Sequence, residues 1–189
     1  FETLDKFSTR GGPLMIRPSE YVLDFNTYSD SREKLIFELE GTYAKDKIGG
    51  SYKQIELDLD WRPNSQIQFS IGPGLQISTE QNQWVGNFDD EYASTTYNTR
   101  HVFARLDQKV ISGNIRLNWT FSPQLSLQLF MQPLFAVGEY SNYKELAKPR
   151  SLEFRNYGEN TSFINYDKTN EEYTVDPDGE NNAPSFVFS

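Results

Sequence analysis

Apolar and polar residues alternate along residues 114–137, and this alternation is the clearest structural pattern in the sequence. The apolar positions are Ile115, Leu117, Trp119, Phe121, Leu125, Leu127, Leu129 and Met131. A repeat of two residues is typical of a β-strand that has one apolar and one polar face. The run Ser122-Pro123-Gln124 interrupts the alternation with a proline between polar residues, which is typical of a tight turn. The stretch therefore predicts a β-hairpin with one apolar side.

The same alternation recurs along most of the chain and predicts six principal strands. They cover residues 20–28, 35–45, 51–62, 66–79, 100–121 and 125–137. Residues 80–99 predict a long hairpin tip, and Gly72-Pro73-Gly74 indicates a bend or bulge in the fourth strand. After Val137 the alternation fades, so residues 138–189 are expected to form a long polar loop with a short hairpin near Phe163–Val175.

Two similar turns give a check on the topology of these strands. Pro63–Ser65 and Ser122–Gln124 resemble each other in sequence, and both follow an aromatic residue closely. In an up-and-down arrangement successive turns alternate between two edges, and we expect these two turns at the same edge. This requires residues 100–121 to form one long strand, because an additional turn at Asp107-Gln108-Lys109 would place the two similar turns at opposite edges. We therefore predict a single strand across this segment.

The alternation alone does not decide which face of the strands is covered. In a soluble β-sandwich the apolar face points inward, whereas in an outer-membrane barrel it points to lipid and the polar face lines the lumen. The polar face here carries long and charged side chains, such as Arg116 and Gln128. Trp119 and Phe121 lie at the turn, as in an interfacial girdle. Short turns also alternate with long loops, as in such barrels.

These features favour an all-β fold made of the antiparallel up-and-down strands of a transmembrane β-barrel with long extracellular loops. We interpret residues 1–189 as a fragment of one outer-membrane β-barrel domain. Six strands are fewer than the eight that a membrane barrel needs, so the remaining barrel strands are expected from elsewhere. A soluble β-sandwich interaction module stays open as an alternative.

The composition narrows the classes of partner and site. The chain has 189 residues and a net charge of −9, which argues against nucleic acid as a partner. It has no Cys and one His, His101, which excludes thiolate and multi-His metal sites. No apolar run approaches the roughly 18 residues of a transmembrane helix. The chain begins at Phe1 and is interpreted as an internal fragment or a processed chain.

Charged residues gather on the predicted polar faces of the strands. They are Glu38, Glu40, Glu56, Asp58, Asp60, Arg62 and Arg116. Such a face could form an acidic lumen wall that selects cations or binds sugar hydroxyls. Paired carboxylates also serve glycosidases, at separations that neighbouring strand positions can reach. The simpler interpretation is a solvated lumen in which these acids pair with basic residues.

Aromatic residues in the predicted loops could stack on sugar rings, or could pack against one another and stiffen the loops. They are Trp84, Phe88, Tyr92, Tyr97, Tyr140, Tyr143 and Tyr157. His101 lies near no Gly-x-Ser-x-Gly elbow, so we assign no catalytic residue and interpret it as a surface or lumen histidine.

The acidic segment near the C-terminal end has the closely spaced carboxylates and the glycine turn that suit a calcium ion. The candidate ligands are Asp176, Asp178 and Glu180, and calcium is the one cofactor considered. The glutamate that closes such a loop is missing, because Val187 occupies its place. An acidic turn is the simpler interpretation of the same residues.

Several runs of sequence, taken together, resemble a known family. They are residues 10–15, 102–108, 116–129, 132–133, 138–141 and 144–147. They are similar to the C-terminal β-barrel region of Bacteroidota-type outer-membrane proteins of unassigned function. Members of that family typically carry an N-terminal domain similar to carbohydrate-binding module family 9. The resemblance covers most of residues 10–160 and implies an outer-membrane location, with lipid and glycan as partners.

The sugar-binding-like domain and the last strands of that family have no counterpart in this sequence, so no binding residue is carried over. The resulting expectation is a segment of an outer-membrane β-barrel that is not itself an enzyme. Its role would be glycan-linked binding at the cell surface or the passage of solutes. The alternative is part of a surface carbohydrate-active hydrolase.

Overall fold

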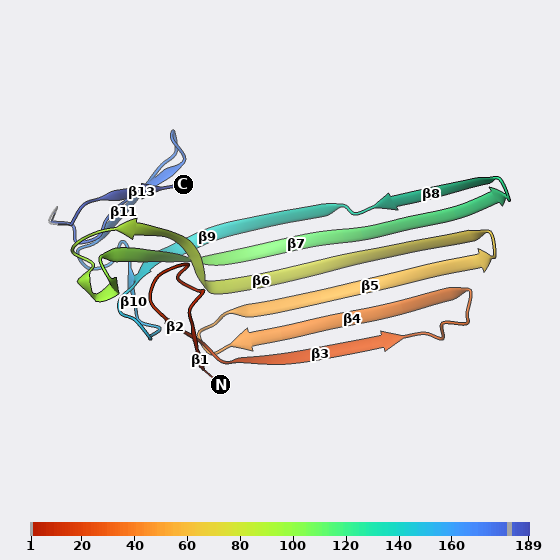
Figure 1. Cartoon of the computed structure of the whole chain (residues 1–189), viewed down its shortest axis with the longest axis horizontal. Coiled ribbons are helices and arrows are strands. Elements are labelled where there is room, and N and C mark those ends of the chain that lie inside the picture. Colours follow the sequence, from red (N-terminus) through yellow and green to blue (C-terminus); the bar gives the residue numbers. More distant parts are fainter. Residues whose placement is uncertain (1, 181–182) are drawn as a thin grey trace. The chain divides into compact units, whose positions relative to one another are not determined.

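The computed structural model describes residues 2–180 and 183–189, which form antiparallel β-sheets with one short 3-10 helix, η1 (Ser94–Thr96) (Figure 1). One small sheet pairs β1 (Thr3–Asp5) with β2 (Met15–Arg17). A second small sheet contains β11 (Phe163–Asp167), β12 (Glu172–Asp176) and β13 (Phe186–Phe188). The prediction of an all-β, antiparallel fold is thus confirmed.

The large sheet has the strand order β10-β9-β7-β6-β5-β4-β3, and β8 also pairs with β7. Its strands are β3 (Glu20–Tyr28), β4 (Leu35–Asp46), β5 (Ser51–Asn64), β6 (Ile67–Asp89), β7 (Thr99–Ser122), β8 (Leu125–Met131), β9 (Leu134–Leu146) and β10 (Phe154–Asn156). Within the described residues none of the three sheets closes on itself, because β3 and β10 stand at the two ends of the large sheet.

Most of the predicted strands are present close to their predicted bounds. β3 matches its prediction, and β4 and β5 extend it by one or two residues at the C-terminal end. β7 is one continuous strand, which confirms the prediction that no turn interrupts residues 107–109. The backbone N–H of Thr120 donates to the carbonyl of Gln66 at 2.8 Å, so the two similar turns lie at the same edge of the sheet, as the alternation of turns required.

Two details of the strands differ from their prediction. The β5–β6 ladder has no bulge at Gly72-Pro73-Gly74, because its register is the same on both sides of this segment and shifts only between Trp61 and Asn64. The glycines instead make space for side chains. A Cβ atom at Gly72 would lie 2.2 Å from an oxygen of Asp58, and one at Gly74 would lie 2.6 Å from the Ser112 hydroxyl.

The last predicted strand is divided into β8 and β9 at Gln132 and Pro133. Pro133 has no backbone N–H and so cannot donate to a strand ladder. Its carbonyl still accepts a hydrogen bond from the N–H of Gly113 at 2.9 Å. Both β8 and β9 pair with β7, so the interruption leaves both segments at the same side of that strand.

The predicted loops contain more regular structure than the alternation indicated. β6 continues to Asp89, which shortens the predicted hairpin tip, and β9 continues to Leu146. The predicted polar loop over residues 138–189 contains more strand than expected, because β10 and β13 lie in that segment besides the two strands of the predicted hairpin. The hairpin expected near Phe163–Val175 is present as β11 and β12. These strands have three to five residues each, too few to show a repeat of two in the sequence.

The chain divides into two compact units, which we describe separately. The core unit contains Phe1–Ser19, Glu80–Leu106 and Tyr140–Ser189, and the sheet unit contains Glu20–Thr79 and Asp107–Glu139. Among the described residues no helix is long and apolar enough to cross a membrane.

Buried apolar side chains are concentrated in the core unit. Met15, Phe103 and Leu146 form one cluster, and Val102, Tyr157 and Val175 form a second. Val102 and Phe103 are neighbours in β7 and point to opposite faces, so this part of β7 is covered on both sides. Strands covered on both faces have continuous apolar runs. The run Val102-Phe103-Ala104 was therefore a signal of a core that the search for alternation overlooked.

Candidate functional site

The acidic residues predicted on the polar face lie opposite one another in neighbouring strands of the sheet unit. The β4–β5 register places Glu38 opposite Asp58 and Glu40 opposite Glu56. Side chains directly opposite in an antiparallel pair are close, and like charges at such positions destabilise the pair. These four carboxylates, called the acidic row below, therefore lower the stability of the sheet unit through their mutual repulsion.

Neutral side chains supply most of the hydrogen bonds to this acidic row. The Asn26 amide donates to Glu38 Oε1 at 2.9 Å and to Glu40 Oε1 at 2.8 Å, and the Gln54 amide donates to Glu56 Oε1 at 2.6 Å. These donors leave the negative charges uncompensated. The row therefore keeps a net negative potential that can attract cations.

The two arginines predicted on this face behave differently. Arg62 forms an ion pair with Asp60, as the simpler interpretation expected. Arg116 instead lies over the ring of Phe130, its cross-strand partner, at 5.2 Å from the ring centre. The structure thus brings together the five acids and Arg62 on β4 and β5, whereas Arg116 lies on β7 against an aromatic ring.

The opposite face of the sheet unit is apolar, and the residues that the structure describes form no second layer over it. Leu35 is 56% exposed, Trp61 is 48% exposed and Leu127 is 46% exposed. The rings of Trp119 and Phe121 lie side by side near the turn, with 4.4 Å between their centres. Apart from Ala44, the buried apolar residues all belong to the core unit.

A cavity of about 380 Å³ lies in the core unit and brings together three of the aromatic residues singled out from the sequence. Its lining includes Arg10, Gln83, Trp84, Tyr140, Tyr143 and Phe188. Of the other candidates for sugar stacking, Tyr92 and Tyr97 are exposed and do not line it, whereas Phe88 and Tyr157 pack in the second apolar cluster. Cavities of this size with mixed aromatic and polar walls are typical of small-molecule sites.

Trp84 is held in place by its neighbours. Its indole N–H donates to Asn87 Oδ1 at 3.0 Å, and the guanidinium of Arg10 lies 4.4 Å from the centre of its ring. Asn87 also donates through Nδ2 to the carbonyls of Thr9 and Arg10, at 3.0 Å and 3.2 Å. The loop that carries Arg10 is thereby fixed above β6.

His101 belongs to the same hydrogen-bond network. Its Nδ1 lies 2.8 Å from Asn87 Oδ1. The amide nitrogen of Asn87 donates elsewhere, so its oxygen faces the imidazole and Nδ1 carries the proton. Gly12 lies against the ring, and a Cβ atom there would come within 2.1 Å of it. Burial lowers the pKa of His101, with the backbone of Thr96 and Thr9 opposing this, so the ring is neutral at pH 7.

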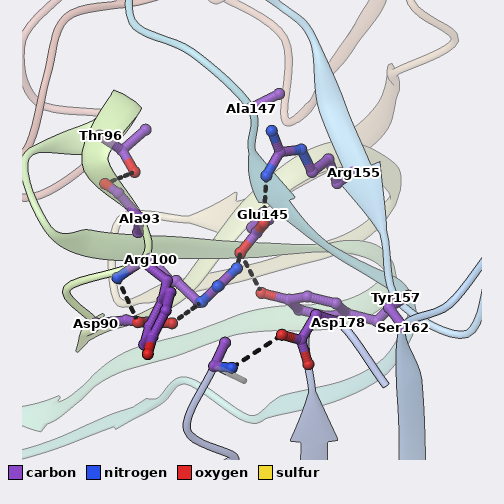
Figure 2. Close-up of polar contacts among 12 residues, drawn as sticks. Asp90, Ala93, Thr96, Arg100, Glu145, Ala147, Arg155, Tyr157, Ser162 and Asp178 are labelled. Atoms are coloured by element: carbon purple, nitrogen blue, oxygen red, sulfur yellow. Dashed lines mark hydrogen bonds and ion pairs between the residues drawn. The ribbon is translucent and has the colours of Figure 1, made fainter. Parts of the chain in front are cut away.

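A buried charged cluster, shown in Figure 2, lies in the core unit, and of its members only Tyr157 was a sequence-based candidate, as a stacking aromatic. Arg100 donates through Nε to Asp90 and through a terminal nitrogen to Glu145, each at 2.5 Å. The Tyr157 hydroxyl donates to Glu145 at 3.0 Å. Arg155 lies 3.6 Å from the same carboxylate. The cluster links the β6–β7 connection, β7, β9 and the residue after β10.

The charged cluster is matched internally, so its role is structural. Burial alone would lower the pKa of Arg100, but hydrogen bonds and charge from Glu145 and Asp90 raise it. Burial, followed by the charge of Glu145, raises the pKa of the Tyr157 hydroxyl, which stays protonated as a donor. No sequence pattern indicated this cluster, because its members are far apart along the chain and share no spacing.

The segment considered for calcium forms a turn in which its carboxylates accept backbone N–H groups. Asp176 accepts from Gly179 at 2.8 Å, and Asp178 accepts from Glu180 at 3.0 Å and from Ala183 at 2.9 Å. These hydrogen bonds lower the pKa of Asp178. Residues 2–180 and 183–189 contain no group of three His, Cys, Asp or Glu side chains placed to hold a metal ion. A calcium site here stays a prediction.

These observations define an all-β protein with a one-sided apolar sheet unit and a separate core unit that holds an aromatic cavity. Residues 1–177 match the model of a domain family described as a domain of unknown function, DUF5916, and the chain belongs to that family. Comparison with curated proteins and with solved structures finds no match.

Proposed function

We propose that the chain is a non-enzymatic segment of an outer-membrane β-barrel from a Bacteroidota-type bacterium. Its role is the binding of glycan at the cell surface or the passage of solutes. The observation that carries this proposal is the uncovered apolar face of the sheet unit. Residues on that face, such as Leu35, Trp61 and Leu127, are about half exposed although they alternate regularly with polar residues.

A membrane accounts for this face better than water does. Soluble monomers rarely expose contiguous apolar patches larger than a few hundred Å². Contact with the hydrocarbon of a bilayer removes such a face from water, and in barrels the lipid-facing band is bordered by aromatic residues. Trp61 and Trp119 have the positions expected of that border, because both lie near the turns that share one edge of the sheet.

The polar face supports the second half of the proposal. In a barrel this face lines an aqueous lumen, where carboxylates remain hydrated and like-charge repulsion is weakened by water and salt. The row formed by Glu38, Glu40, Glu56 and Asp58 would then favour cations or donor-rich solutes such as sugars. The open edges of the large sheet leave places for the barrel strands and the carbohydrate-binding-like domain proposed as partners.

The three tryptophans provide a direct test of the lipid-facing side. Trp61 and Trp119 lie in the sheet unit, whereas Trp84 lies in the core unit and serves as the matched control. Three variants would each retain one tryptophan, with phenylalanine at the other two positions. Each is expressed with all the sequence that its gene encodes and is reconstituted in phosphatidylcholine vesicles with or without bromine on the acyl chains.

Bromine quenches tryptophan fluorescence only on contact, so we expect strong quenching of Trp61 and Trp119 and little quenching of Trp84. Equal, weak quenching of all three would contradict the proposal. So would a protein that stays monomeric and folded in buffer without detergent, because its apolar face would then be exposed to water or covered by protein.

A further inference from the structure

We propose that the cavity of the core unit binds an acidic saccharide. Arg10 would hold its carboxylate, and Tyr140 would stack on its sugar ring. This inference deepens the glycan-binding part of the proposed function and rests on it. The cavity volume of about 380 Å³ accommodates one or two sugar rings, within the range of small-ligand sites.

Arg10 is positioned to recognise a carboxylate. Its guanidinium stacks on the Trp84 ring through one flat face. The N–H groups point outward in the plane of the guanidinium, so stacking leaves them free to bind a carboxylate with two hydrogen bonds. Within the described residues Arg10 has no carboxylate partner of its own. The side chain is exposed at the cavity, so it is available to a ligand.

The backbone of Arg10 is fixed in an unusual conformation. Its φ angle is +47°, in the left-handed region that non-glycine residues rarely adopt. Its N–H donates to the carbonyl of Phe7 at 3.0 Å, and its carbonyl accepts from Asn87. These contacts hold the arginine over Trp84 before any ligand arrives, which lowers the entropy lost on binding.

The stacking surface for a sugar is Tyr140 rather than Trp84. One face of Trp84 is covered by Arg10, its N–H is bonded to Asn87, and it also packs against the first apolar cluster. Tyr140 is 44% exposed at the cavity. Beside it, burial raises the pKa of the Tyr143 hydroxyl, which therefore keeps its proton.

The charge of the lining selects an acidic sugar over a neutral one. Arg10 is the charged side chain of the cavity wall, and none of the residues lining the cavity is Asp or Glu. The chain as a whole carries a net charge of −9, so anions are repelled from most of its surface. An acidic ligand therefore gains attraction at Arg10, the one charged side chain among the residues that line this cavity.

The test compares a galacturonic acid trimer with a neutral galactose trimer by isothermal titration calorimetry, using the full-length protein in detergent. We expect the unsubstituted protein to bind the acidic trimer at least about tenfold more tightly than the neutral one, since one charged hydrogen-bonded contact contributes roughly that factor. Arg10→Gln should remove this preference and leave binding of the neutral trimer unchanged. Tyr140→Leu should weaken both.

Two controls separate the outcomes. Arg32→Gln removes an exposed arginine of the sheet unit and should change neither affinity. Sodium sulfate should compete only weakly, because it lacks the ring that stacks on Tyr140. Equal affinities for the two trimers, an unchanged preference in Arg10→Gln, or full competition by sulfate would each overturn the inference. If neither trimer binds, the glycan part of the proposed function fails too, whereas bromolipid quenching still tests its membrane part.

Discussion

At the scale of single residues, Arg100 is the position where a substitution should destabilise the protein most. Its guanidinium is buried and bonded to two carboxylates that are themselves buried, Asp90 and Glu145. Two carboxylates with no cation between them would repel each other in a region of low dielectric constant. The cluster therefore stabilises the core unit only while Arg100 is present.

We predict that Arg100→Met destabilises the protein by about 3–5 kcal/mol, since it leaves buried Asp90 unpaired and leaves Glu145 with only the exposed Arg155 as a cation. The measurement is a urea unfolding curve followed by the fluorescence of Trp84 in a variant that has no other tryptophan. Arg32→Met is the matched control, because Arg32 pairs with Asp30 on an exposed turn and its loss should leave the curve unchanged. Equal effects of the two substitutions would show that the buried cluster contributes nothing.

His101 gives the core unit a dependence on pH. Burial lowers the pKa of its imidazole, so the unfolded state takes up a proton at a higher pH than the folded state does. The contribution of neutral His101 to the free energy of unfolding is fully present above about pH 6.5, the ordinary pKa of histidine. It is lost as the pH falls from there through the lower pKa of the folded state.

We predict that the unsubstituted protein loses stability below pH 6.5 faster than His101→Gln does, by up to about 1.4 kcal/mol per pH unit. Glutamine is neutral and can still donate to Asn87. The measurement is the free energy of unfolding of both proteins between pH 7.5 and 5. Parallel curves would show that His101 takes up its proton equally in the folded and unfolded states.

At the scale of strands, the sequence predicted best where the two faces of a strand meet different surroundings. β3, β4 and β5 have a polar and an apolar side, so each residue type reports its face. The acidic row followed from the same pattern, because antiparallel pairing brings Glu40 and Glu56 together.

Prediction from the sequence failed where the two faces of a strand have similar surroundings. β10 to β13 are short, and aromatic residues of β10 and β13 pack against the two apolar clusters of the core unit. Asn142 within β9 and Glu171 in the turn between β11 and β12 adopt positive φ angles where the sequence has no glycine. The Arg100 cluster and the grouping of Trp84 with Tyr140 depend on contacts between distant segments, which periodicity cannot report.

Gly41 in β4 illustrates how an aromatic residue can protect a weak point of a strand. The register places Phe25 of β3 directly opposite Gly41, and a Cβ atom at Gly41 would lie 2.1 Å from the Phe25 ring. The ring thus covers backbone that glycine leaves bare, while half of the ring remains exposed on the apolar face.

We predict that Phe25 and Gly41 are energetically coupled. Phe25→Ala and Gly41→Ala should each destabilise the protein, but the double substitution should be less destabilising than their sum by about 1 kcal/mol, since alanine at residue 41 then replaces the missing ring. Thermal unfolding in detergent measures the cycle. Tyr21, on the same face of β3, is the control, and Tyr21→Ala should be additive with Gly41→Ala. Additivity in both cycles would mean that the ring does not protect the glycine.

At the scale of the whole molecule, the two units obtain their stability from different sources. The core unit contains the two apolar clusters and the buried charges, so its stability is internal. In the sheet unit the larger apolar side chains lie largely on an open face, and burial of that face requires an external apolar phase. Hydrophobic stabilisation scales with the apolar area removed from water, at about 25 cal/mol per Å².

We therefore predict that removal of detergent affects the two units unequally. Hydrogen–deuterium exchange, measured before and after dilution of the detergent below its micelle concentration, should show loss of protection in β4 and β5. Amides around Val102 and Phe103 should remain protected, because both side chains are buried within the core unit. Phe37→Ser should reduce protection of β4 in detergent and matter little after dilution. Equal loss of protection in both units would mean that they unfold together and that the apolar face does not set the stability of the sheet unit.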